Sequence, residues 1–121
     1  MKLPVKSNHF FTLAGASVLT RNFRQYAAPG AIKGGLFWKE ALRALVDQPE
    51  CVAMRYYYGR EDSGKPVLVL VGVDAQGRDM THGILLEASI PCPPFCDAPN
   101  GLNFDKSEVQ RISNIMEVSK V

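Results

Sequence analysis

The chain has 121 residues, of which 46% are hydrophobic and 21% charged, and its formal net charge at pH 7 is +2. This length and composition suit one globular domain with a single core, and exclude a chain that is disordered throughout. A net charge so close to zero argues against nucleic-acid binding and membrane-surface binding, and no run approaches the roughly 20 apolar residues that span a bilayer.

Cysteine content and the first residues bear on the cellular location. The three cysteines, Cys51, Cys92 and Cys96, are too few for a disulfide scaffold, so we expect a cytoplasmic protein. The apolar stretch over residues 10–19 faintly resembles a secretory signal, but it is short and contains polar residues. The same residues make a better amphipathic helix, so no signal peptide is expected.

Two helices are predicted in the first 47 residues. From Thr12 to Tyr26, apolar residues recur at three- and four-residue spacing, which marks one face of a helix, and Thr12 is a suitable N-cap. A second helix is predicted from Gly35 to Asp47, with a broad apolar face and a charged one. A proline after each segment prevents the helix from continuing.

The pattern then changes to that of β-strands, which are predicted over residues 51–60, 67–73 and about 78–89. The connections at residues 61–65 and 74–77 are short, so consecutive strands must be antiparallel neighbours. The sequence therefore predicts a three-stranded antiparallel meander with residues 67–73 in the centre.

The segment after the sheet is a loop rich in proline and cysteine, and residues 105–108 beyond it have the spacing of a capping box. A short C-terminal helix is therefore expected. The predicted fold class is α+β, with the two N-terminal helices packed on the meander. A single domain is expected over residues 1–121, with helices in 12–47, the sheet in 51–90, and the loop and C-terminal helix in 91–121.

The central strand is apolar on both sides, whereas a sheet covered on one face alternates apolar and polar residues. Its odd-numbered residues are all valine and point one way. The opposite face is predicted to hold the apolar side chains of Tyr57, Leu68, Leu70 and Leu85. The helices can cover one face, and the C-terminal helix, a second copy of the chain, or a foreign partner or ligand covers the other. These four residues are therefore the interface candidates.

The most unusual local sequence is Cys92-Pro93-Pro94-Phe95-Cys96. Two thiols at this spacing could ligate a metal, form a reversible disulfide, or simply pack in a proline-braced loop. Cys51 is expected at the opposite end of the sheet, roughly 30 Å away, so one site with all three cysteines is not expected. The structural loop is the favoured interpretation, and no bound metal or cofactor is predicted.

No pattern of an active site stands out. His82 alternates with Met80 and Ile84 toward a buried face, and Glu87 is expected to be solvated or paired with Arg55. The basic residues on the helices are better explained as a solvated face than as a nucleic-acid surface. No catalytic residue is therefore assigned, and a non-enzymatic protein is favoured.

Two segments resemble motifs of a known family. Residues 67–77, VLVLVGVDAQG, and residues 91–96, PCPPFC, are similar to motifs in a family of small uncharacterised bacterial proteins. The likeness covers about residues 12–103. It implies a stand-alone cytoplasmic domain of unknown function, with no catalytic residues to transfer.

The function expected from the sequence is that of a small protein-interaction module, whose partner is a second copy of the chain or another protein. The alternative is a thiol-based redox or metal sensor that uses Cys92 and Cys96. A ligand pocket near Trp38, Tyr56 and Tyr58 ranks third, because aromatic side chains at such spacings usually fill a core.

Overall fold

The computed structural model describes residues 3–104, and its chain divides into two compact units. One unit comprises residues 3–7 and 35–90, and the other comprises residues 8–34 and the segment that begins at residue 91. The predicted C-terminal helix lies outside the described residues. The single domain over residues 1–121 stays a prediction.

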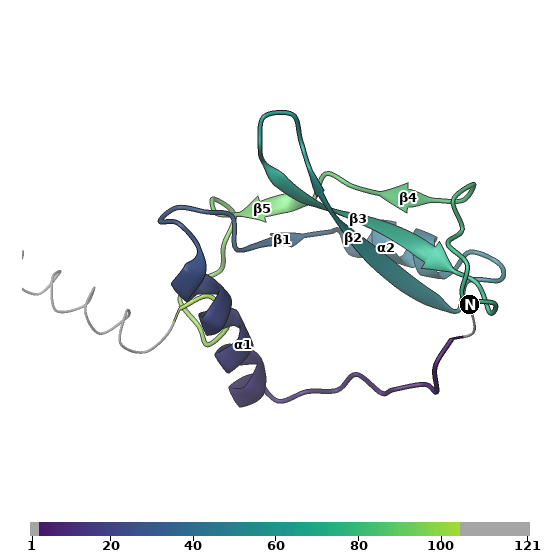
Figure 1. The fold of residues 1–121 in the computed structure, drawn as a ribbon, viewed down its shortest axis with the longest axis horizontal. Coiled ribbons are helices and arrows are strands. Elements are labelled where there is room, and N and C mark those ends of the chain that lie inside the picture. Colours follow the sequence, from purple (N-terminus) through teal and green to yellow (C-terminus); the bar gives the residue numbers. More distant parts are fainter. Residues whose placement is uncertain (1–2, 105–121) are drawn as a thin grey trace, which may run out of the picture. The chain divides into compact units, whose positions relative to one another are not determined.

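The first unit contains the predicted antiparallel meander. β2 (Ala53–Arg60) pairs with β3 (Pro66–Val73), and β3 pairs in turn with β4 (Leu85–Leu86), as Figure 1 shows. Every residue of β2 has a partner in β3. The sheet order β2-β3-β4 confirms that β3 is central. The first two predicted strands are correct apart from their first residues.

The third predicted strand, over residues 78–89, is wrong in its length. Asp79 forms an isolated antiparallel bridge with Val73, and only the two residues of β4 resume the pairing with β3. Between these two stretches the chain turns away from β3, and His82 lies exposed in that turn. The alternation that predicted a buried His82 therefore does not apply.

α2 (Lys39–Val46) lies against all three strands of this sheet, and it is drawn behind β2 and β3 in Figure 1. It begins later than predicted, because β1 (Gly34–Leu36) occupies the start of the expected helix. Two consecutive glycines in that segment disfavour a helix by about 1 kcal/mol each relative to alanine. Leu45 anchors the helix, since its side chain is fully buried.

The segment that follows α2 lies over the face of the sheet that carries Gly72. A Cβ added to Gly72 would stand 3.1 Å from Nε2 of Gln48, so glycine permits this close approach. The same side chain donates from Nε2 to the Leu45 carbonyl at 2.8 Å and accepts from the Ile84 N–H at 2.8 Å. Gln48 thus bonds a backbone group in the interruption of the third strand.

A second, two-stranded sheet pairs β1 with β5 (Ile90–Cys92). The chain passes from one unit to the other within both of these strands. The Lys33 N–H donates to the Cys92 carbonyl at 2.8 Å beside them. Strands of three residues are too short to show an alternating pattern, so no pattern in the sequence predicts them.

The second unit contains α1 (Leu13–Tyr26), which confirms the first predicted helix. Thr12 is its N-cap, as predicted, because the side chain accepts a hydrogen bond from the Gly15 N–H at 3.0 Å. None of the residues of α1 is buried. The packing of this helix on the meander stays a prediction, because α1 and the meander belong to different units.

The turn after β3 depends on glycine at position 77. Gly77 has a φ of 80°, and its N–H donates to the Asp74 carbonyl at 2.9 Å. The Asp74 carboxylate accepts from the N–H groups of Gln76 at 2.9 Å and Arg78 at 3.0 Å. A left-handed backbone within an Asx-type network therefore reverses the chain.

Replacement of Gly77 by alanine should reduce the free energy of unfolding by about 1–2 kcal/mol, because a Cβ disfavours the left-handed conformation. The midpoint of urea unfolding measures this loss. Gly34→Ala is the matched control, since a Cβ at Gly34 meets no atom within 4 Å and its φ is outside the left-handed region. Equal losses in both variants would contradict this role of the turn.

Candidate functional site

The register of the meander divides the predicted interface residues between two faces. Residues directly opposite each other in an antiparallel pair point to the same side. Tyr57 and Leu85 are each opposite a valine of β3, so they lie on the side that we call the valine face. Leu68 and Leu70 point to the other side, the leucine face. The predicted grouping of these four residues on one face is therefore wrong.

Burial separates the same four residues further. Leu70 is only 3% exposed and belongs to the core, whereas Tyr57 is 48% and Leu85 is 53% exposed. Leu68 is partly buried. Leu70 is therefore not available to a partner, and a role of the other three in an interface stays a prediction.

The exposed apolar surface of the leucine face follows β2. Met54, Tyr56 and Tyr58 lie opposite the even-numbered residues of β3, and we call these three residues the tyrosine row. Tyr56 is 52% and Tyr58 is 84% exposed. Their rings meet edge to face, with centroids 5.6 Å apart and planes at 80°. Large aromatic side chains therefore line up on the outer strand of the sheet.

The outer edge of β2 presents backbone groups that no described strand pairs with. Directly after β2, the Glu61 N–H donates to the Lys65 carbonyl at 2.9 Å. Backbone groups along a strand alternate in direction with a period of two residues, so the odd-numbered residues of β2 also direct their N–H and C=O groups toward β3. The Gly72 carbonyl accepts instead from Met80 on the far side of β3, at 2.8 Å, which fits the same phase. The N–H and C=O groups that point outward are those of Met54, Tyr56, Tyr58 and Arg60.

A polar cluster lies across the valine face. The Arg55 guanidinium is paired with the Asp79 carboxylate, and the Tyr57 hydroxyl donates to the same carboxylate at 2.5 Å. Arg55 and Tyr57 belong to β2, whereas Asp79 bridges Val73 from the other side of β3. Both side chains therefore reach across β3, where Val71 and Val73 are buried.

The partner of Arg55 differs from one sequence expectation. Arg55 pairs with Asp79 and not with Glu87. Glu87 is exposed, which agrees with the other expectation for this residue, that it is solvated. No sequence pattern marks Asp79 as a partner of Arg55, although it falls within the third predicted strand. Its position opposite Val73 gives it a role, and only the strand register shows that position.

The cluster holds each of its groups in the form that it has at neutral pH. The hydrogen bond from Tyr57, followed by that from Arg55, lowers the pKa of Asp79. The bond to Asp79 raises the pKa of Tyr57 and that of Arg55. A general acid or base needs a pKa that moves toward neutrality, and these shifts move away from it. The cluster therefore suits a structural role.

The second predicted site, the proline-rich loop, contains a disulfide between Cys92 and Cys96, with Cα atoms 4.8 Å apart. The third cysteine, Cys51, is free and belongs to the other unit. Within residues 3–104, no three side chains of His, Cys, Asp or Glu form a group that could hold a metal ion. The sulfur atoms of Cys92 and Cys96 are therefore bonded to each other, and Cys51 is the free cysteine.

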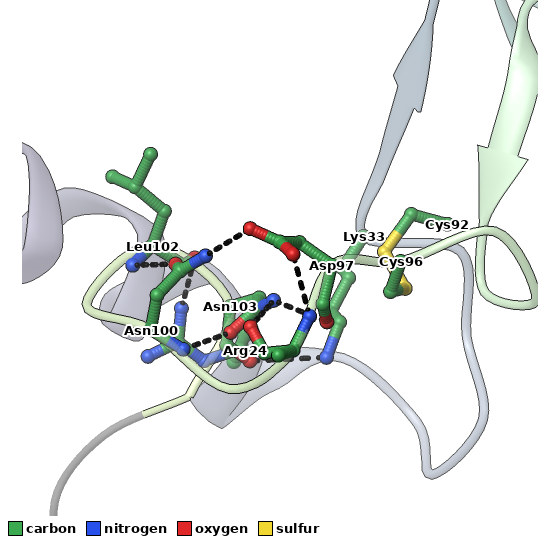
Figure 2. The surroundings of a disulfide bond; sticks show 9 residues. Arg24, Lys33, Cys92, Cys96, Asp97, Asn100, Leu102 and Asn103 are labelled. Atoms are coloured by element: carbon green, nitrogen blue, oxygen red, sulfur yellow. Dashed lines mark hydrogen bonds between the residues drawn. A yellow bond between two sulfur atoms is a disulfide. The ribbon is translucent and has the colours of Figure 1, made fainter.

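Amide side chains organise the residues after the disulfide, as Figure 2 shows. Asn103 donates from Nδ2 to the carbonyls of Asp97 at 3.1 Å and Ala98 at 3.2 Å. Its Oδ1 accepts from the Asn100 N–H at 2.7 Å. The loop therefore closes on itself within seven residues, 97–103, directly after the disulfide.

Two cationic side chains bind the same loop from distant parts of the sequence. Arg24 of α1 donates from Nη1 to the Leu102 carbonyl at 2.7 Å, and Lys33 donates from Nζ to the Asn103 carbonyl at 3.0 Å (Figure 2). Lys33 also lies 4.8 Å from the ring centroid of Phe104. Both cations were expected on a solvated face, and no local pattern signals contacts across 70 residues or more.

Comparisons with known proteins give no match, whether with protein-family models, with curated proteins or with solved structures. The resemblance to small bacterial proteins therefore stays a prediction. Among residues 3–104, none of the helices combines the length and the apolar character that crossing a membrane requires.

The pH dependence of stability should report the polar cluster. The pKa of Asp79 is lowered in the folded chain from an unfolded value of about 3.9, so the unfolded state binds more protons at acid pH. The contribution of Asp79 to stability is therefore present above about pH 4 and lost as the pH falls through the folded pKa. When the pH falls from about 5 to 2, the free energy of unfolding of the Asp79→Asn variant should therefore decrease less than that of the natural chain.

Urea midpoints across this pH range measure the effect, and Tyr57→Phe should give an intermediate result because Arg55 still pairs with the carboxylate. Glu87→Gln is the control, since it removes an exposed carboxylate of the same unit. If Asp79→Asn and the natural chain lose stability equally on acidification, the cluster does not stabilise the sheet.

Proposed function

We propose that the protein is a non-enzymatic interaction module that binds a second copy of itself through β2. A single observation carries this proposal: an eight-residue strand presents both an outer edge that no strand within residues 3–104 pairs with and a row of exposed large side chains. The proposal moves the contact surface from the four predicted interface residues to the tyrosine row and the outer edge of β2, because Leu70 is buried.

The side chains of the tyrosine row favour a protein partner. Tyrosine supplies a large contact area with few rotatable bonds, and it is enriched at the energetic centres of interfaces. Tyr56 already restrains the ring of Tyr58 by their edge-to-face contact, so less freedom is lost when a partner binds. Exposed aromatic rings side by side on a strand are costly to leave in water.

The backbone edge of β2 favours the same surface. Natural proteins usually protect a free edge with lysine, proline, a bulge or an inward charge. Residues 54–60 contain neither lysine nor proline. Arg55, the charge nearest the middle of the strand, is neutralised by Asp79. The edge is therefore open to pairing with another strand.

The chain should sediment as a dimer at high micromolar concentration, and removal of the tyrosine row should weaken the dimer. Tyr56→Ala and Tyr58→Ala should each raise the dissociation constant at least about tenfold, which corresponds to roughly 1.4 kcal/mol. Sedimentation velocity over a range of concentrations measures the constant.

Tyr26→Ala is the matched control, because Tyr26 is a tyrosine of α1 that is as exposed as Tyr58 but belongs to the other unit. It should leave the dissociation constant unchanged. A natural chain that stays monomeric at all concentrations would refute the proposal.

The disulfide favours a second candidate function, that of a thiol-based redox sensor. Cys92 and Cys96 are bonded immediately before the loop that Arg24 and Lys33 contact. A dithiol reductant would attack one sulfur as a thiolate, break the S–S bond and leave two thiols, while the reductant becomes a disulfide. The loop would then lose its covalent closure.

Alkylation counts test this second candidate. The denatured oxidised chain should take up one alkyl group, at Cys51, and the reduced chain should take up three. A sensor further requires the change to occur near the glutathione potential of the cytosol, at about −220 to −320 mV. Mass spectrometry of the chain alkylated in glutathione buffers measures both the number of alkyl groups and the potential of the change. The Cys51→Ser variant should take up one alkyl group fewer in each state, none when oxidised and two when reduced. Three free thiols under oxidant would refute the redox role.

A further inference from the structure

We infer that the second copy pairs with β2 edge to edge, as an antiparallel strand related by a two-fold axis at Tyr57. This inference rests on the proposed function and specifies its geometry. The resulting sheet would run without interruption through β4, β3 and β2 of one copy and then β2, β3 and β4 of the other.

The backbone groups select an antiparallel self-pairing. Met54, Tyr56, Tyr58 and Arg60 direct their N–H and C=O groups outward, at every second residue. Two antiparallel strands exchange pairs of hydrogen bonds at every second residue in the same way. A two-fold axis makes one surface serve both partners, which is the commonest arrangement of dimers.

The length of the strand selects the position of the axis. With the axis at Tyr57, Tyr56 lies opposite Tyr58 of the partner subunit, and Met54 lies opposite Arg60 of the partner subunit. All outward residues of β2 then have partners within β2. An axis at Tyr56 would place Arg60 opposite residue 52, before the strand, and an axis at Tyr58 would place Met54 opposite residue 62, after it.

The charges of β2 tolerate this register. The two copies of Arg60 would lie about 20 Å apart and the two copies of Arg55 about 13 Å apart, from a rise of about 3.3 Å per residue. Both separations exceed the Debye length of about 8 Å at physiological ionic strength. Arg55 is also paired with Asp79. Like-charge repulsion is therefore weak.

The side chains gain most in the same register. Tyr56 and Tyr58 of both copies would meet on one face, because outward residues of β2 all point to the leucine face. Cross-strand aromatic pairs stabilise sheets, and the edge-to-face pair of each copy would join that of the other. Met54 would lie beside the aliphatic part of the partner's Arg60.

Amide hydrogen exchange on the unmodified full chain tests this geometry. The N–H groups of residues 54, 56, 58 and 60 should exchange at least about tenfold more slowly at concentrations where the chain sediments as a dimer than where it is monomeric. The N–H groups of residues 55, 57 and 59 are the internal control, because β3 protects them at every concentration.

Engineered cysteines give a second measurement, in a Cys51→Ser background. Directly opposite residues of the Tyr57 pair would have Cα atoms about 4.5 Å apart, which a disulfide can bridge. Tyr57→Cys should therefore form a covalent dimer under mild oxidation roughly tenfold faster than Arg55→Cys, whose two copies are too far apart. Both variants remove one contact with Asp79, so they are matched in that respect.

The outcomes distinguish self-association through β2 from the specific edge-to-edge geometry. A dimer whose outward amides exchange fast, or in which Arg55→Cys links as rapidly as Tyr57→Cys, overturns the edge-to-edge geometry and leaves self-association standing. A chain that sediments as a monomer throughout overturns both. Protected outward amides together with rapid linkage of Tyr57→Cys establish the geometry.

Discussion

The pairing of β3 with β2 along its whole length is the constraint on which the sheet unit depends. β3 is apolar on both faces, so it is stable only when it lies between two other strands and when other parts of the protein shield both faces from water. The register decides which side chains share each cover. A shift by one residue would move the tyrosine row to the valine face and separate Arg55 and Tyr57 from Asp79.

The two faces of β3 are covered by different means, and this difference leaves β2 as the outer surface. The segment after α2, with Gln48 close to Gly72, lies on the leucine face. Long polar side chains that converge on Asp79 lie across the valine face. Gln48 lies close to β3, and the polar cluster converges on Asp79 on the far side of β3. The aromatic side chains and the outer backbone edge of β2 stay exposed within the described residues. The surface proposed for self-association is thus a consequence of how the core is covered.

The second unit is organised by different forces. No residue of α1 is buried, so little of its stability can come from apolar packing within the described residues. A disulfide, amide hydrogen bonds and two cations on backbone carbonyls hold its loop instead. Hydrogen bonds from charged donors are stronger than neutral ones, which suits a loop that lacks a regular backbone ladder. The cysteine pair was visible as a candidate in the sequence, but its cationic neighbours were not.

The sequence by itself determined the features that depend on near neighbours: the helix that Thr12 caps, the antiparallel order of strands joined by short turns, and the central place of β3. These follow from periodicity, capping and loop length, which act over a few residues. The tertiary structure alone decided that Tyr57 and Leu70 face opposite sides, that Gln48 bonds Ile84 where the third strand is interrupted, and that Arg55 pairs with Asp79. Each of these depends on strand register or on contacts between distant segments, and a shift of one residue reverses the facing of every side chain in a strand.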